Sequence, residues 1–314
     1  MTSIALLGFE LTWDATLQNV ILGSLILGVT SGVLGCFAVL RRQSLIGDTV
    51  AHAALPGICL AFILTGTRSS GCLLVGGLIT GLIGTLVMLA ITRWSLVAQE
   101  TALGIVLSVF FGVGILLLTR IQHTDDAGQS GLDRFIFGQA ATILPRDVLI
   151  MAIASAVALG IVALLFKEFK LLAFDPDFAA SLGFRPGIMG TLLAGLVVTA
   201  VMIGLQTVGV VLMVSLLIAP AVAARQWTRS LGLMIVVSAG FGMASGVLGA
   251  VSSSLVDRLP TGPMIVLFAS MLVIISLLLA PGRGLIWNVQ TRRVRSRAFA
   301  RRLATTYHHE VPAP

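Results

Sequence analysis

Two side chains in the first part of the sequence could bind a metal ion. Asp48 and His52 lie four positions apart at the start of a long apolar run. Side chains at this spacing share one face of a helix. A carboxylate and an imidazole are ligands that Zn²⁺, Mn²⁺ and Fe²⁺ accept. One copy supplies only two such ligands, so a fuller set requires a second copy related by a two-fold axis.

The spacing leaves two other interpretations of this pair open. In the first, Asp48 only caps the helix, because Asp is a preferred N-cap, and His52 is an interior histidine bonded to it. In the second, the two groups relay protons. An ionisable group in a membrane segment costs about 2.5–3.5 kcal/mol and therefore indicates function by default. Pro56, four residues after His52, removes a helix hydrogen bond and is expected to kink the helix that carries the pair.

The composition shows which medium surrounds these groups. Hydrophobic residues make up 57% of the 314 residues and charged residues only 11%. A soluble domain carries about a quarter charged residues, and a disordered chain needs low hydrophobicity. Long unbroken apolar runs are unlike the alternation of barrel strands. The sequence therefore predicts an all-α polytopic membrane protein.

Charge-poor runs of about 20 residues predict the membrane-spanning helices. The uncharged stretch 188–224 is long enough for two crossings, or for one crossing and a re-entrant segment. We therefore expect a bundle of nine spans, with eight as the alternative. The other seven runs are 17–40, 45–65, 72–92, 103–119, 148–166, 231–251 and 264–280.

The basic residues predict the orientation of the bundle. If the turn at Arg41 and Arg42 lies inside and successive spans alternate in direction, 15 of the 20 Lys and Arg residues lie inside, these two included. This agrees with the positive-inside rule. The N-terminus is then outside and the C-terminus cytoplasmic. We divide the chain into a transmembrane domain at 1–285 and a basic cytoplasmic tail at 286–314. The net charge of +7 indicates contact with the anionic bilayer surface rather than with nucleic acid.

The chain lacks the motif of an ATPase. Its two lysines, Lys167 and Lys170, are followed by Glu and Leu, whereas a P-loop requires Gly-Lys-Ser or Gly-Lys-Thr. No zinc-protease or serine-hydrolase motif occurs in the sequence either. We therefore expect no enzyme activity in this chain, and any ATP hydrolysis must come from separate subunits.

The stretch between the fifth and sixth predicted spans contains the signals of a short helix. Asp175 is a preferred N-cap, Pro176 suits the first helical position, and Gly183 is a typical stop. The predicted helix, at about 175–183, lies outside the membrane on the basic side. Because so short a helix is not stable alone, we expect it to lie against another surface.

The sequence resembles a known family in the motif at 40–57, which reads LRRQSLIGDTVAHAALPG. This motif closely resembles the signature of the permease subunits of ATP-binding-cassette importers for manganese, zinc and iron. The resemblance extends over about 15–285. Further matches lie at 100–105, 208–221 and 263–281, and in the cytosolic segment at Phe174, Asp175, Ala179, Ala180 and Gly183.

The resemblance implies a fold and a set of partners. The fold is similar to that of the vitamin B12 and siderophore (type II) importer permeases, with fewer helices and a short cytosolic coupling helix. The implied partners are a second permease chain, of the same or a sister type, two ATPase subunits, and a metal-binding protein outside a bacterial plasma membrane. Asp48 and His52 map onto metal-coordinating gate residues, and the segment from Phe174 to Gly183 onto the ATPase-docking helix.

The resemblance also implies that the metal is cargo. No permanently bound cofactor is expected, and Mn, Zn or Fe would pass through the dimer axis as the transported ion. Two rival functions stay open at this point. A permease for a metal chelate or siderophore would not need Asp48 and His52, and a proton-coupled secondary transporter would not need an ATPase.

Overall fold

The apolar runs of the sequence form helices in the computed structural model, which describes residues 3–6, 9–12, 15–66, 69–123, 143–207, 209–255, 259–281, 284 and 287. Eight of the described helices are long and apolar enough to cross a membrane. They are α1 (Ala15–Leu40), α2 (Ile46–Thr65), α3 (Ser70–Trp94), α4 (Gln99–Gln122), α6 (Pro145–Leu164), α9 (Pro186–Thr207), α11 (Leu231–Leu255) and α12 (Thr261–Leu279). The prediction of an all-α membrane bundle is confirmed.

The uncharged stretch 188–224 divides into two helices, as expected. Helix α9 ends at Thr207 and α10 (Val210–Trp227) follows after a short break. Gly209 precedes α10 with a φ of 85°, a conformation that glycine adopts readily and other residues avoid. Helix α10 has 18 residues, only one fewer than α12. Eight described helices therefore count as candidate spans, and α10 is a further apolar helix close to them in length.

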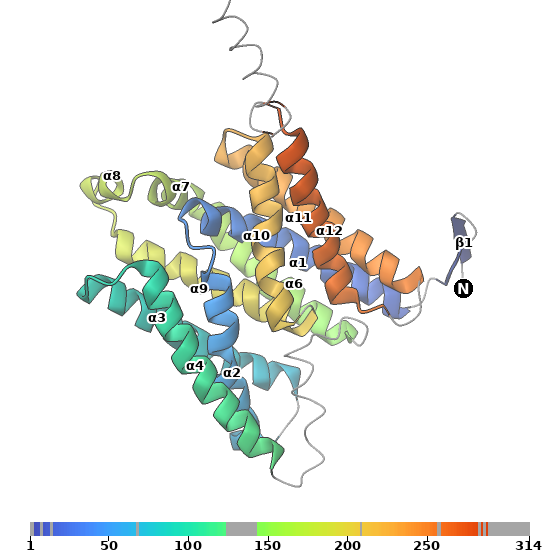
Figure 1. The fold of residues 1–314 in the computed structure, drawn as a ribbon, viewed down its shortest axis with the longest axis horizontal. Helices are drawn as coiled ribbons and strands as arrows, with labels where there is room; N and C mark the ends of the chain where they lie inside the picture. The colour runs from blue at the N-terminus through green and yellow to red at the C-terminus, as the bar shows by residue number, and fades with distance from the viewer. Residues whose placement is uncertain are drawn as a thin grey trace, which may run out of the picture.

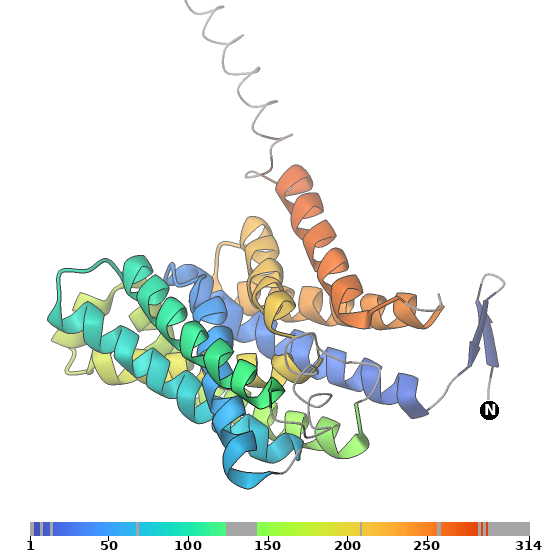
Figure 2. The same ribbon diagram turned by 60° about the horizontal axis from the view of Figure 1, so that its bottom comes forward.

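The helices form two groups, which are connected by α9 and by the contact of α2 with α10. Figures 1 and 2 show α2, α3 and α4 together on one side and α10, α11 and α12 on the other. Helix α1 packs most extensively on α11, and α2 packs on α3 and α4. Helix α2 also contacts α10, so the helix that carries Asp48 and His52 touches both groups.

Small residues bring α1 and α11 into backbone contact. Gly28 and Gly242 face each other so closely that a Cβ on either would overlap the backbone of the other. Nearby, the hydroxyl of Ser238 donates a hydrogen bond of 2.7 Å to the carbonyl of Gly32. In lipid, such close packing of small residues is a main source of helix association. This contact fixes α1, which leads directly into α2.

Two short helices, α7 (Phe166–Phe174) and α8 (Pro176–Ser181), lie between α6 and α9. The short helix predicted at about 175–183 corresponds to α8, whereas α7 was not predicted. Figure 1 shows both at the end of the molecule opposite the N-terminal strands. In α7, Phe169 is fully buried, and its ring packs edge-on against Phe37 of α1 at 5.9 Å between centroids. This contact anchors α7 to the bundle.

A small hairpin of β1 (Ser3–Leu6) and β2 (Phe9–Thr12) precedes α1. The sequence analysis did not predict these two antiparallel strands. The predicted basic tail at 286–314 lies, apart from Trp287, outside the described residues.

Candidate functional site

Helix α2 places Asp48 in its first turn and His52 one turn later. The helix begins at Ile46, and the N-cap position belongs to Leu45, which forms no side-chain cap hydrogen bond. The interpretation of Asp48 as the N-cap is therefore wrong. Its carboxylate still lies near the positive end of the helix dipole, which favours a negative charge there.

The two side chains face each other at the distance expected of two ligands of one ion. Nε2 of His52 lies 3.4 Å from Oδ1 of Asp48. A charge-assisted hydrogen bond between these groups would measure about 2.7–2.9 Å. Two atoms bound tetrahedrally to one Zn²⁺ at about 2.0–2.2 Å are about 3.3–3.5 Å apart. The side chains are 24% and 36% exposed for His52 and Asp48, so an ion can reach them.

Neighbouring helices border the pair on both sides. On the α4 side, the rings of His52 and Phe111 form a T-shaped contact with centroids 4.7 Å apart and planes at 75°. On the α10 side, a Cβ on Gly47 would lie 2.9 Å from a methyl carbon of Leu217, so α2 and α10 touch directly. Sequence reasoning missed Phe111, because no local pattern shows which aromatic residue of a distant span faces a histidine.

The pair is not a complete metal centre by itself. Within the described part of the chain, no group of three or more His, Cys, Asp and Glu side chains could hold a metal ion. Pro56 lies inside α2 and is buried; the kink predicted there stays a prediction. Two ligands on one surface are what the sequence analysis expected of a site shared between two copies.

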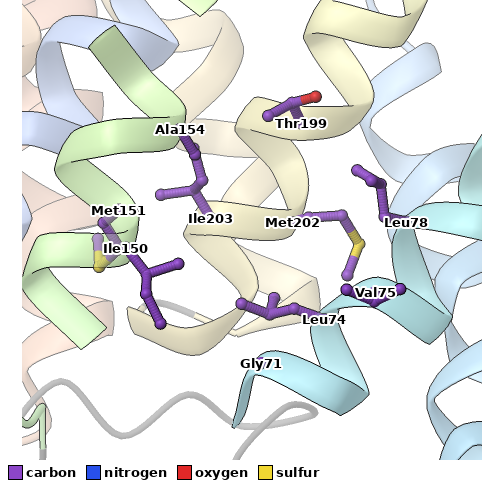
Figure 3. A pocket seen from close by; sticks show the side chains of 10 residues that line it. All are labelled: Gly71, Leu74, Val75, Leu78, Ile150, Met151, Ala154, Thr199, Met202 and Ile203. Atoms are coloured by element: carbon purple, nitrogen blue, oxygen red, sulfur yellow. The ribbon is translucent and has the colours of Figure 1, made fainter. Parts of the chain in front are cut away.

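An apolar cavity elsewhere in the bundle is unsuited to a bare ion. It measures about 300 Å³ and lies between α3, α6 and α9 (Figure 3). The hydroxyl of Thr199 borders it but already donates a 3.0 Å hydrogen bond to the carbonyl of Gly195. The lining is Gly71, Leu74, Val75, Leu78, Ile150, Met151, Ala154, Thr199, Met202 and Ile203.

Helix α8 has the capping chemistry that the sequence predicted. Oδ1 of Asp175 accepts a 2.9 Å hydrogen bond from the backbone N–H of Phe178, and Pro176 is the first helical residue. Gly183 ends the turn with a φ of 87°. Asp175 and Gly183 therefore act as the predicted start and stop signals.

The surface of α8 carries exposed apolar side chains. Ala179 is buried, whereas Ala180 is exposed. The large side chains of Phe174, Phe178 and Leu182 are 61%, 51% and 56% exposed. Phe178 and Leu182 were not among the predicted docking residues. An exposed apolar cluster outside the spans is typical of a protein interaction site.

Comparison with known proteins relates the whole sequence to transport proteins. The sequence pattern of the ABC 3 transport family matches residues 13–280. The chain is 54% identical over 281 residues to the zinc transport system membrane protein TroC of Treponema pallidum, covering 89% of this chain and 94% of that protein. It is 49% identical over 281 residues to the manganese transport system membrane protein MntC of Bacillus subtilis, covering 88% of this chain and 65% of that protein.

Two solved structures have the same arrangement of helices. A chain of PsaBC from Streptococcus pneumoniae, solved in complex with Fab, matches with a TM-score of 0.76 and 30% identity, covering 86% of this chain and 94% of that chain. An inward-facing metal-chelate type ABC transporter matches with a TM-score of 0.62 and 19% identity, covering 82% and 84% of the two chains. The second likeness concerns the fold alone.

Proposed function

Because this chain belongs to the ABC 3 transport family and is the permease subunit of an ATP-binding-cassette importer of metal ions, we propose that Asp48 and His52 bind the ion during its passage. The observation that carries this proposal is the 3.4 Å separation of their ligating atoms. Family membership also sets aside the proton-coupled secondary transporter, since ATP hydrolysis by a separate subunit drives these importers.

The cargo we propose is a bare divalent transition-metal ion: Zn²⁺, Mn²⁺ or Fe²⁺. The relatives named for zinc and for manganese are both close to this chain. An Asp–His pair accepts all three ions, and selectivity among them follows geometry and availability. A resident metal cofactor is not part of the proposal, because a site that held its ion tightly could not pass it on.

The pathway we propose lies between two permease chains. Each chain contributes one Asp48 and one His52, so a symmetric pair of chains offers four ligands at the axis. The second chain is either the same or a sister permease. A metal-binding protein docks outside, on loops that include residues 120–147, and delivers the ion. Residues 124–142 of that stretch lie outside the described residues.

The α8 end of the molecule faces the cytoplasm in this proposal. Two arginines lie beside the first turn of α9: the nearest guanidinium nitrogens of Arg41 and Arg93 are 3.4 Å and 3.8 Å from where a Cβ would stand on Gly190 and Gly187. Basic residues gather on the cytoplasmic side of membrane proteins. The proposed orientation has the C-terminus in the cytoplasm, and the bacterial origin of the relatives supports a bacterial plasma membrane as the proposed location.

The ATPase subunits act through α8. Two ATPase subunits, one for each permease chain, would receive the exposed apolar side chains of Phe174, Phe178 and Leu182. ATP binding moves α8 and opens the axis outward, so that the ion reaches Asp48 and His52. The imidazole must be neutral to coordinate the ion, and hydrolysis then allows release into the cytoplasm.

The experiment that tests the site compares matched variants of the assembled importer in proteoliposomes. Asp48→Asn and His52→Ala should lower Zn²⁺ and Mn²⁺ uptake at least about tenfold, the loss expected when one ligand is removed. Glu100→Gln, which changes another acidic residue in the first turn of a span, should stay within about twofold. Normal uptake by both site variants would refute the proposal.

A second candidate function, import of a metal chelate, is distinguished by its substrate. A chelate carries its own ligands and would not need Asp48 and His52. Loss of bare-ion uptake in the site variants, with no uptake of siderophore-bound iron by the parent, favours the bare ion. Siderophore uptake that persists in both variants favours the chelate.

A further inference from the structure

Helix α4 places a phenyl ring directly on the candidate metal ligand His52. The ring of Phe111 meets the imidazole in a T-shaped contact, with centroids 4.7 Å apart and planes at 75°. Its neighbour Phe110 points elsewhere: a ring carbon of Phe110 lies 3.8 Å from where a Cβ would stand on Gly84 of α3. These two adjacent phenylalanines of α4 therefore face different helices: Phe110 faces α3, and Phe111 contacts His52 of α2.

Among the described residues, the polar contact of the imidazole is with Asp48. Nε2 faces Asp48 at 3.4 Å. Across the described ranges, no side-chain hydrogen bond fixes His52 from a second side. Metal-binding histidines almost always have their second nitrogen held by a carboxylate, carbonyl or water. Here the ring of Phe111 packs against the imidazole and can restrict its orientation instead.

Phe111 can hold the imidazole because α4 is fixed against α2 on both sides of the ring. Before it, the hydroxyl of Thr49 donates a 3.4 Å hydrogen bond to the carbonyl of Leu103. After it, α4 passes so close to α2 that a Cβ on Gly114 would lie 2.8 Å from a methyl carbon of Leu55. The ring therefore stays beside His52 whenever these two spans stay together.

The geometry points to Phe111 as a positioning residue that fixes the imidazole of His52 for metal binding; this inference rests on the proposed function of the Asp48–His52 pair. Without the ring, the imidazole samples more rotamers, and binding an ion must then order it. The expected loss of affinity is about 2- to 12-fold, the equivalent of the 0.5–1.5 kcal/mol of an aromatic pair at about 1.4 kcal/mol per tenfold.

The test measures Co²⁺ binding to the complete permease by the visible absorption of the bound ion, together with Mn²⁺ uptake by the assembled importer. Phe111→Leu should weaken Co²⁺ binding about 2- to 12-fold. Phe111→Tyr keeps the ring and should restore binding to within about twofold. Phe110→Leu, the matched control on the same helix, should bind like the parent, and thermal unfolding should show that both leucine variants are assembled.

The outcomes separate this inference from the proposed function. If Asp48→Asn and His52→Ala abolish Co²⁺ binding while Phe111→Leu binds as tightly as Phe110→Leu, the positioning role is overturned and the site stands. If Asp48→Asn and His52→Ala both bind Co²⁺ normally, the site itself fails. Equal weakening in Phe111→Leu and Phe111→Tyr also overturns the positioning role. Should Phe111→Leu not assemble, Phe111→Met replaces it in the same comparison.

Discussion

Replacing Asp175 with alanine should weaken the attachment of the ATPase subunits by removing a helix cap. Helix α8 has only six residues, far fewer than an isolated helix needs to be stable. The side chain of Asp175 accepts a 2.9 Å hydrogen bond from the backbone N–H of Phe178. Loss of such a cap costs about 0.5–2 kcal/mol. The helix that we propose as the docking site of the ATPase would therefore be formed less often.

The size of the effect follows from the population of the formed helix. The apparent dissociation constant rises by the factor by which the competent fraction falls. At about 1.4 kcal/mol per tenfold, the loss of the cap predicts about 2- to 30-fold weaker binding of the ATPase subunit. The assay is equilibrium binding of the purified ATPase subunit to the detergent-solubilised permease, with metal uptake per ATP hydrolysed as the second measurement.

Two variants distinguish the effect of losing the cap hydrogen bond from the effect of losing the negative charge. Asp175→Ser keeps an N-cap oxygen and should bind the ATPase nearly as well as the parent. Asp177→Ala removes the same charge from the first turn of α8 without removing the cap and should have a smaller effect. The reasoning is refuted if Asp175→Ser binds as weakly as Asp175→Ala, or if Asp177→Ala and Asp175→Ala are equivalent.

One further prediction concerns the packing of the bundle. Gly242→Ala should lower the melting temperature of the permease, because the added methyl meets the backbone of α1 and overpacking costs about 1–3 kcal/mol. Gly240→Ala is the control: its added methyl meets nothing within 4 Å, so the melting temperature should stay unchanged or rise. Equal melting temperatures of the two variants would contradict this account.

Local chemistry in the sequence predicted part of the geometry of the candidate site. The spacing of Asp48 and His52 predicted two side chains on one helical face, and the structure places them 3.4 Å apart. The signals at Asp175 and Gly183 predicted the start and end of α8. Both predictions succeed because side chains within a turn of each other are positioned by the helix itself.

Features that depend on packing between helices were not predictable from the sequence. The contact of Phe111 with His52 depends on how α4 rotates against α2. The N-cap interpretation of Asp48 was wrong because the turn after Leu40 lets the helix begin at Ile46. Helix α7 was missed because its charged residues break the apolar pattern, although it is buried at Phe169 and Leu172.

The close contact between α1 and α11 has a consequence for biosynthesis. Helix α1 is synthesised before the other described helices, yet its most extensive partner is the penultimate described span. Until α11 leaves the ribosome and enters the bilayer, Gly28 and Gly32 of α1 lack the helix against which they pack. Contacts between distant parts of a chain form late. A nascent chain that stops before α11 would therefore lack the backbone contact of Gly28 with Gly242.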